Sequence, residues 1–466
     1  MTTPAAPSPA TLGELRASGH QYKEIKQELR DNLLSKLAGG EERFPGIVGF
    51  DETVLPELER ALLAGHDVVL LGERGQGKTR VIRALVDLLD EWTPVIADSE
   101  LNEHPFHPIS PGTRRLAAEA GDDLKIAWLH RSMRYGEKLA TPDTSVGDLI
   151  GDVDPIRVAQ GRTLGDPETI HFGLVPRTNR GIFAVNELPD LAERIQVSLL
   201  NVLEERDIQV RGYQLRLPLD LLLVASANPE DYTNRGRIIT PLKDRFGAEI
   251  RTHYPLDLEL ETDLVRQEAK LVAEVPEHLL EVLARFTRAV RESPSVDQRS
   301  GVSARFAIAA AETVAASALR RAGLNGEAEP VARIGDTVSV TSTLRGKVEF
   351  ESGEEGREIE ILAHLLRTAT ADTFRTRLAG LDLSGFTDLV AEGNMIETGE
   401  LTAADELLRQ VGTVPGLAKV LERLCLGDAP TRGQAAAGVE FALEGLHLTR
   451  RLSKDLTDDG RTVYGG

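Results

Sequence analysis

The stretch Val68-Val69-Leu70-Leu71-Gly72-Glu73-Arg74-Gly75-Gln76-Gly77-Lys78-Thr79 decides the fold. An apolar run enters a glycine-rich turn, and the turn ends in Lys-Thr ahead of an amphipathic run over residues 81–86. The stretch matches G-x-x-x-x-G-K-[ST] at every fixed position. It therefore predicts a buried strand, a phosphate-binding loop and a helix, in that order. The residues that we expect to line the bound anion are Gly72, Glu73, Arg74, Gly75, Gln76, Gly77, Lys78, Thr79 and Arg80.

The chemistry of this loop follows from its residue types. Gly72, Gly75 and Gly77 allow the backbone to fold so that successive N–H groups point inward around an anion. The positive end of the following helix points to the same place. Lys78 adds a full charge for the β- and γ-phosphates, and the Thr79 hydroxyl is a candidate ligand of Mg²⁺. The loop thus predicts a nucleoside triphosphate bound together with Mg²⁺.

A second apolar turn, Phe44-Pro45-Gly46-Ile47-Val48-Gly49-Phe50, precedes the loop and a predicted helix over residues 54–64. Its apolar backbone could hold an adenine ring, with Val48 as the candidate contact. It could equally be an ordinary core loop, and the sequence leaves both interpretations open.

Composition limits the class of protein. The chain has 466 residues, enough for two or three domains, and 54 Lys+Arg against 74 Asp+Glu give a net charge of −20. This charge disfavours a nonspecific nucleic-acid binder. No apolar run reaches membrane-spanning length, and residues 1–7 lack the features of a signal peptide. The single cysteine, Cys425, is typical of a reducing compartment. We therefore expect a cytoplasmic protein without a membrane partner.

Two later apolar runs end in polar residues. Residues 181–187 end in Asn186-Glu187, and residues 221–228 end in Asn228. Continuous apolar runs are typical of strands inside a parallel sheet, whose carboxyl ends carry ligand residues. Glu187 is the candidate that orients the hydrolytic water, although a plain strand-end carboxylate is the alternative. Asn186 could accept a hydrogen bond from a metal-bound water but brings no negative charge.

The pattern along the chain predicts four segments. Residues 1–18 read as a flexible tail, and residues 19–255 as an N-terminal helix followed by an α/β core with insertions. Helical spacing then dominates, so we expect a helical lid over residues 256–325. A mostly helical extension follows over residues 326–466.

Four short segments outside these motifs also allow local predictions. Alternating β-type residues at 338–350 suggest a hairpin. Residues 456–466 show no periodicity, so we expect a frayed end. His104 and His107 could be a metal pair, but solvated turn histidines are the simpler interpretation because a third ligand is missing nearby. The basic residues Arg131, Arg134 and Lys138 read as a solvated face.

Taken together, these motifs resemble the AAA+ ATPase subunit I of magnesium chelatase, within the wider MoxR-like group. The resemblance covers residues 44 to about 320. Besides the phosphate-binding loop, it rests on segments that resemble the family's nucleotide-side entry, pre-insertion segment, approach to the second strand, pre-sensor hairpin, sensor 1 and Leu-Asp-Arg-Phe element. These are residues 44–49, 144–154, 172–181, 207–217, 228–230 and 242–246.

The resemblance implies a fold and a set of roles. The fold is a three-layer AAA+ core with a parallel sheet, followed by a helical lid. The cofactors are ATP and Mg²⁺, with Thr79 and Asn186 on the metal side and Glu187 as the catalytic glutamate. Asn228 would be sensor 1 and Arg305 sensor 2. Arg245 would be an arginine finger that reaches the nucleotide of the next subunit.

A finger that acts in trans requires a homo-oligomer, such as a ring. The resemblance also implies that the protein remodels a client, such as one with a von Willebrand A domain. A structural ion pair between Arg245 and its neighbour Asp244 is the alternative to the finger.

One departure matters: Asn186 stands where the family has Asp. It puts the rate of hydrolysis in question more than ATP binding, so an ATP-binding scaffold with weak hydrolysis is one alternative function. A transcription regulator of the sigma-54 activator type is the other. It would need a Gly-Ala-Phe-Thr-Gly-Ala loop and a basic recognition helix, and the sequence has neither.

Overall fold

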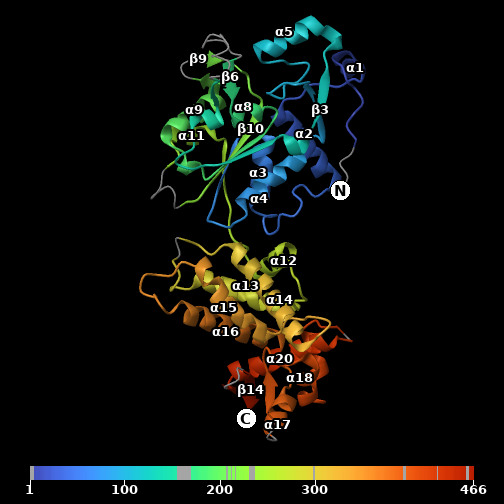
Figure 1. Cartoon of the computed structure of the whole chain (residues 1–466), viewed down its shortest axis with the longest axis vertical. Helices are drawn as coiled ribbons and strands as arrows, with labels where there is room; N and C mark the ends of the chain where they lie inside the picture. Colours follow the sequence, from blue (N-terminus) through green and yellow to red (C-terminus); the bar gives the residue numbers. More distant parts are fainter. Residues whose placement is uncertain are drawn as a thin grey trace. The chain divides into compact units, whose positions relative to one another are not determined.

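The computed structural model describes residues 5–154, 169–205, 208–210, 213–215, 217–229, 237–297, 300–391, 395–427, 429–457 and 461–465. The chain forms two compact units, residues 1–253 and 254–466, which we call unit 1 and unit 2 (Figure 1). In the described part of the chain, every helix is too short or too polar to cross a bilayer.

Unit 1 is built on a five-stranded parallel sheet, as predicted. The strand order is β11-β1-β10-β7-β4, so the phosphate-loop strand β1 lies between β11 and β10. β1, β7 and β10 are buried along their whole length, which is why their sequences are almost continuously apolar. These strands are β1 (Val68–Leu71), β4 (Tyr135–Leu139), β7 (Gly181–Asn186), β10 (Leu221–Ala227) and β11 (Ala248–Arg251).

Helices cover both faces of this sheet and make two separate cores (Figure 1). Alternate residues of one strand serve the two faces: Ile182 and Ala184 pack toward α2, α3 and α4, whereas Phe183 and Val185 pack toward α8, α9 and α11. The helices are α2 (Ile25–Gly39), α3 (Val54–Leu63), α4 (Lys78–Ala84), α8 (Leu174–Arg177), α9 (Glu193–Glu205) and α11 (Thr240–Arg245). Unit 1 thus has three layers, with helices on both faces of a β-sheet.

The remaining elements of unit 1 are insertions and short turns outside the main sheet. β2 pairs with β3, β5 with β6 and β8 with β9, each pair antiparallel. The strands are β2 (Trp92–Ile96), β3 (Ile126–His130), β5 (Gly151–Val153), β6 (Ile170–Phe172), β8 (Ile208–Val210) and β9 (Tyr213–Leu215). The helices are α1 (Leu12–Ala17), α5 (Pro111–Ala120) and α6 (Val146–Leu149), with 3₁₀ turns η1 (Leu85–Leu88), η2 (Gly121–Asp123), η3 (Arg131–Met133) and η5 (Leu188–Asp190).

The expectation of a flexible tail over residues 1–18 was wrong for its second half. α1 occupies residues 12–17 and buries Leu12 and Leu15. The Leu12 N–H donates to the Leu124 carbonyl at 2.9 Å, and the Trp128 indole donates to the Pro9 carbonyl at 2.8 Å. The segment is ordered because these contacts tie it to the insertion, which local composition could not reveal.

The interpretation of Arg134 as part of a solvated basic face was also wrong. Arg134 is 1% exposed and makes a two-pronged ion pair with Glu28 of α2, with N–O distances of 2.6 and 2.8 Å. It stands just before β4, an edge strand that the sequence did not indicate. The pair joins the N-terminal helix α2 to this edge of the sheet.

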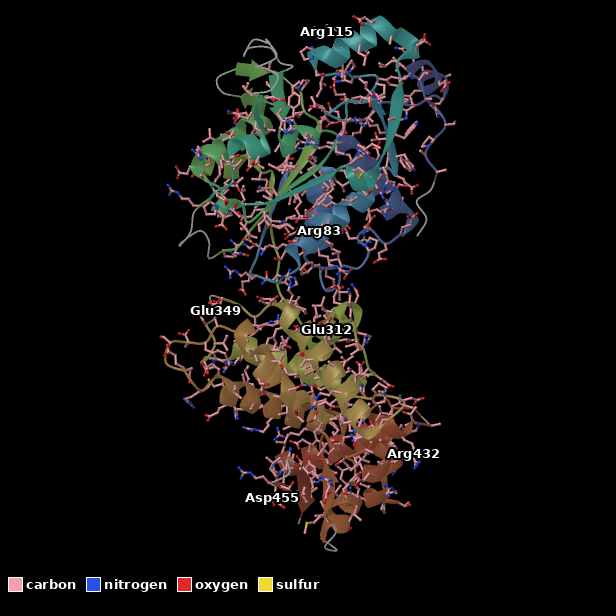
Figure 2. The ribbon with its side chains drawn as sticks, in the orientation of Figure 1. Arg83, Arg115, Glu312, Glu349, Arg432 and Asp455 are labelled. Atoms are coloured by element: carbon pink, nitrogen blue, oxygen red, sulfur yellow. The ribbon has the colours of Figure 1, made fainter. Side chains whose placement is uncertain are left out.

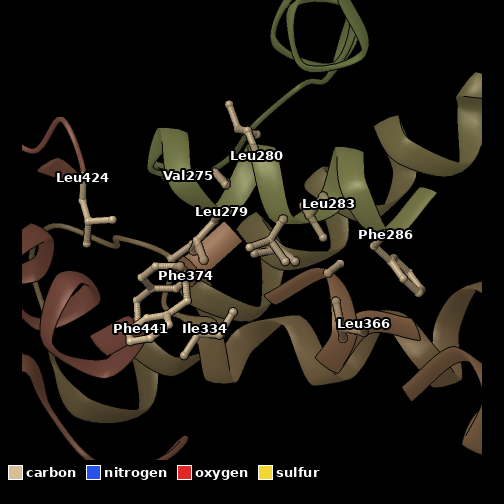
Figure 3. Packing of buried hydrophobic residues seen from close by; sticks show 14 of the residues in the cluster. Val275, Leu279, Leu280, Leu283, Phe286, Ile334, Leu366, Phe374, Leu424 and Phe441 are labelled. Carbon is tan, nitrogen blue, oxygen red and sulfur yellow. The ribbon is translucent and has the colours of Figure 1, made fainter. Parts of the chain in front are cut away.

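Unit 2 is mostly helical and has one hydrophobic core that runs from Val265 to Tyr464 (Figure 3). Because this core passes through both predicted segments, the division into a lid (256–325) and an extension (326–466) stays a prediction. The helices are α12 (Leu258–Glu268), α13 (Glu277–Glu292), α14 (Ala304–Asn325), α15 (Val338–Leu344), α16 (Glu358–Arg377), α17 (Ser384–Ala391), α18 (Ala404–Val411), α19 (Leu417–Arg423) and α20 (Arg432–Leu448), with turns η6 (Ile334–Thr337) and η7 (Arg345–Lys347).

α20 is the central helix of unit 2. Residues 436–446 are buried without a break, as expected of a helix surrounded by protein. Phe374 of α16 lies against it beside Phe441 (Figure 3), and a Cβ at Gly445 would come within 1.9 Å of the Phe374 ring. Glycine at 445 is therefore what lets α16 and α20 approach.

Two predictions for unit 2 were wrong. Residues 338–344 form helix α15 instead of a hairpin strand, because Val340, Thr341 and Leu344 recur at helical spacing and are buried. The C-terminal residues are also ordered: β13 (Ser453–Leu456) and β12 (Ile396–Thr398) flank β14 (Thr462–Gly465). Tyr464 anchors this small sheet at 1% exposure.

Candidate nucleotide site

The phosphate-binding loop adopts the conformation that its glycines predict. Gly75 and Gly77 have φ values of 76° and 77°, which residues with a Cβ rarely adopt. A Cβ at Gly72 would lie 1.9 Å from the Thr252 hydroxyl and 2.3 Å from the Gln76 amide oxygen. The Gln76 oxygen accepts hydrogen bonds from the Glu73 N–H at 3.0 Å and from the Thr252 hydroxyl at 2.9 Å. Thr252, which follows β11, therefore stabilises the loop through its hydrogen bond to Gln76.

Lys78, Asn228 and Glu187 form one hydrogen-bonded chain. The buried Lys78 ammonium donates to the Asn228 amide oxygen at 2.7 Å, and the Asn228 amide nitrogen donates to Glu187 Oε2 at 2.7 Å. Lysine only donates and a carboxylate only accepts, so the two partners fix the orientation of the amide. Lys78 also donates to the carbonyls of Gly72 and Glu73. The structure thus brings together three residues that are widely separated in the sequence.

Glu187 has an unusual backbone. Its φ and ψ of 57° and 48° are left-handed, an uncommon conformation for a residue with a long side chain. The Glu187 N–H donates to the Ser226 hydroxyl at 3.3 Å, which holds the turn after β7 against β10. Strained residues of this kind cluster at active sites, so this geometry marks Glu187 as a functional candidate.

Asn186 belongs to a second network on the same end of the sheet. Its amide nitrogen donates to Glu137 Oε1 at 2.5 Å, and its amide oxygen accepts from the Ser226 hydroxyl at 3.2 Å. Arg83 of α4, which is labelled in Figure 2, lies next to this network. It donates to both Glu137 oxygens at 3.0 and 3.1 Å, and the Tyr135 hydroxyl donates to Glu137 at 3.0 Å. Hydrogen bonding to Glu137 raises the pKa of Arg83. The amide is held between a carboxylate and a hydroxyl.

The residues present fit a magnesium ion. Thr79, Asn186 and the nearby carboxylates offer only oxygen ligands, which Mg²⁺ prefers. Within the described ranges, no group of three or more His, Cys, Asp or Glu residues is arranged to hold a metal by itself.

The other predicted site residues lie in different places. Val48 is half-buried in the turn before α3, and Arg74 and Arg80 are exposed beside the loop. Arg245 ends α11, is 47% exposed, and pairs with Glu204 of α9. Arg245 thus pairs with Glu204 and not with its neighbour Asp244. Arg305 belongs to unit 2, where it is exposed at the start of α14.

Two histidines that could have held a metal have another arrangement. His104 is buried at 1% exposure, which corrects the expectation of a solvated turn, whereas His107 is exposed. The His104 Nε2 lies 3.1 Å from His20 Nε2, and its Nδ1 accepts from the Phe106 N–H at 3.0 Å. Burial lowers the pKa of His104 to about 2. His104 is thus a neutral core residue with a fixed hydrogen-bond pattern.

Sequence reasoning missed Glu137, Ser226 and Thr252 as neighbours of the site. Ser226 could have been found, because it lies in β10 two residues before Asn228, which directly follows that strand. Glu137 offered no signal, since its strand is short and partly exposed. Glu230, a part of the predicted sensor segment, lies outside the described residues.

Comparisons with known proteins agree with the motif-based resemblance. A family model described as the sigma-54 interaction domain matches residues 163–245. Magnesium-chelatase subunit ChlI of Cyanophora paradoxa is 32% identical over 218 residues, covering 45% of this chain and 58% of that protein. The ChlI subunit of Nostoc sp. is 29% identical over 242 residues, covering 51% of this chain and 61% of that protein. The chain thus spans about three-fifths of the length of these relatives.

A cryo-EM-based structure of the complex between subunits BchI and BchD of magnesium chelatase is 22% identical, and the match covers 68% of this chain and 98% of that one. The two structures superpose with a TM-score of only 0.36. The strand order of unit 1 and the sequence matches together confirm the prediction of an AAA+ α/β fold similar to magnesium-chelatase subunit I. Placement in the narrower MoxR-like group stays a prediction.

Proposed function

We propose that this chain binds ATP with Mg²⁺ in the loop around Lys78 and hydrolyses it, as an AAA+ motor subunit that remodels a partner protein. The observation that supports the proposal best is the chain of hydrogen bonds from Lys78 through Asn228 to Glu187. It connects the group that would hold the β- and γ-phosphates to the group that would accept a proton from the attacking water.

Each residue has a distinct part in the proposed reaction. Lys78 exchanges its contacts with the loop carbonyls for phosphate oxygens, which carry more negative charge. Asn228 then donates to the γ-phosphate or the water, and Glu187 takes the proton of that water as a general base. Mg²⁺, when bound beside Thr79 and Asn186, supplies charge neutralisation at the phosphate oxygens.

We further propose that the active form is a homo-oligomer, such as a ring, in which Arg245 of one copy completes the pocket of the next. Exposure of Arg245 supports this, because a finger has to be accessible. Arg305, exposed at the start of α14, is the proposed sensor 2 residue. The client, for example a protein with a von Willebrand A domain, and the cytoplasmic location belong to the same proposal.

A second candidate is a regulator of the sigma-54 activator type. The match of residues 163–245 to the sigma-54 interaction domain favours it. Retention of a specific DNA fragment in a shift assay at moderate salt would support this candidate. The third possibility, an ATP-binding scaffold, rests on Asn186, and tight ATP binding without turnover would support it.

The deciding experiment measures steady-state ATP turnover of the full chain, its Lys78→Ala variant and a Lys125→Ala control. Lys125 has an exposed side chain in unit 1 outside the site. We expect turnover in the parent chain and in the control, and none above background in Lys78→Ala. Equal turnover in all three proteins would contradict the proposal.

A further inference from the structure

Asn186 leaves the end of β7 without the carboxylate that the resembling family has there, yet a carboxylate stands beside it. We propose that Glu137 supplies the missing negative charge and holds the Asn186 amide oxygen ready for the water shell of Mg²⁺. Glu137 is thus a positioning residue for the metal. The inference rests on the proposed function, since it concerns the metal of the same nucleotide site.

Glu137 lies on the same face of the sheet as Asn186. Glu137 pairs with Ala184 in the parallel ladder between β4 and β7, so both side chains point to the same face. Asn186 follows Ala184 by two residues and shares that face. It is the face covered by α4, the helix that begins with Lys78 and Thr79. Glu137 therefore lies on the side from which the phosphate loop approaches.

Hydrogen bonds to Glu137 and Ser226 fix the orientation of the Asn186 amide. Glu137 can only accept, so it requires the amide nitrogen at 2.5 Å, and the amide oxygen is left facing the Ser226 hydroxyl. Asn186 and Ser226 are 7% and 2% exposed, which leaves them little freedom. An amide oxygen has two lone pairs, and Ser226 occupies one. The second can accept from a metal-bound water.

The negative charge of Glu137 is partly shielded from solvent. The Glu137 side chain is 21% exposed, less accessible than its ionic partner Arg83 at 62%. The pair is therefore screened by water mainly on the side of Arg83. An alternative is that Glu137 merely ties β4 to α4, in which case its charge would not influence metal binding. The two explanations differ in what happens when the charge moves to position 186.

The experiment compares Glu137→Gln, Asn186→Asp and the double variant, and measures binding of a fluorescent ATP analogue at increasing Mg²⁺ and in EDTA. Glu137→Gln should raise the Mg²⁺ concentration for half-maximal binding about tenfold, because loss of a residue that orients a metal ligand has effects of this size. Asn186→Asp alone places two carboxylates in hydrogen-bond contact. The double variant restores one carboxylate and one amide, so its Mg²⁺ dependence should return to within about threefold of the parent.

Controls separate the possible failures. Asp87→Asn removes another arginine-paired carboxylate, bound to Arg131 at 3.1 Å, and should leave the Mg²⁺ dependence unchanged. Thermal unfolding checks that each variant is folded. An unchanged Mg²⁺ dependence in folded Glu137→Gln, or a double variant no better than Glu137→Gln, would overturn the inference while ATP binding stands. Absence of ATP binding by the parent protein would instead overturn the proposed function.

Discussion

Arg245 in unit 1 and Arg321 in unit 2 are both paired with carboxylates, but their surroundings are opposite. Arg245 is 47% exposed and pairs with Glu204, which is 39% exposed. Arg321 is 2% exposed and pairs with Asp336 at 3.1 Å and Glu327 at 2.9 Å, and Glu327 also pairs with Arg333 at 2.8 Å.

The difference shows which arginine is available for function. An exposed ion pair contributes about 0–1 kcal/mol, so Arg245 can leave Glu204 at little cost. Removing one partner of a buried network leaves uncompensated charge and costs several kcal/mol. Arg321 is therefore a structural residue that ties α14 to η6, whereas Arg245 can reach another molecule.

The largest effect concerns Arg245. Arg245→Ala should lower ATP turnover about 1000-fold while ATP affinity changes little, because an arginine finger acts on the transition state. The control is Arg16→Ala, since Arg16 is also exposed and pairs with the exposed Asp122.

Mixing tests the action of Arg245 in trans. Equal amounts of Arg245→Ala and Lys78→Ala should together regain turnover, because one copy keeps its pocket and the other keeps its finger. If the mixture stays inactive while the two variants co-assemble, as judged by light scattering, the trans role is wrong.

Arg321→Met should destabilise unit 2 by about 3 kcal/mol, since it breaks the buried network. The two tryptophans, Trp92 and Trp128, both lie in unit 1, so their fluorescence reports unit 1 while circular dichroism reports both units. In urea, the circular-dichroism transition should shift and the fluorescence transition should not.

Arg320→Met is the matched control for that variant. Arg320 is the preceding residue of α14 but is 62% exposed and pairs with the exposed Glu400. We expect its effect to stay within about 0.5 kcal/mol. Similar effects of both substitutions would contradict the contrast between buried and exposed arginines.

Glu187→Gln should reduce turnover about 100-fold, because the amide cannot accept the proton of the attacking water. ATP binding should persist, since the oxygen of the introduced amide can still accept from Asn228. Glu193→Gln, at an exposed position at the start of α9, serves as the control. Undiminished single-turnover hydrolysis in Glu187→Gln would assign the base to another residue.

The smallest effect is a pH dependence of unit 2. Burial lowers the pKa of His278 to about 3, and neither ring nitrogen has a hydrogen-bond partner among the described residues. Between pH 6.5 and about 3 the unfolded chain binds a proton here that the folded chain does not, so stability falls as pH falls. The loss from pH 7 to 5 is up to about 2 kcal/mol.

His278→Leu should flatten this slope in urea titrations followed by circular dichroism. His364→Leu, at an exposed position of α16, should not. Equal slopes for the parent chain and His278→Leu would show that another group carries the pH dependence.

The sequence predicted those parts of unit 1 whose signals are local. The glycine-rich loop and the apolar runs at β7 and β10 carry their own patterns, so Lys78, Glu187 and Asn228 were found. Glu137 and Arg134 were not, because their surroundings depend on which strands become neighbours. Helix α15 was mistaken for a hairpin, since contacts with α14 and α16 override the β propensity of its valines and threonines. The missed features therefore depend on tertiary contacts.

Isothermal titration of Mg-ATP into the full chain and into Lys78→Ala shows whether the loop around Lys78 is the ATP site. We expect saturable binding of one ATP per parent chain and no measurable binding to Lys78→Ala at the same concentrations. Equal binding by both proteins, or no heat with either, would contradict it.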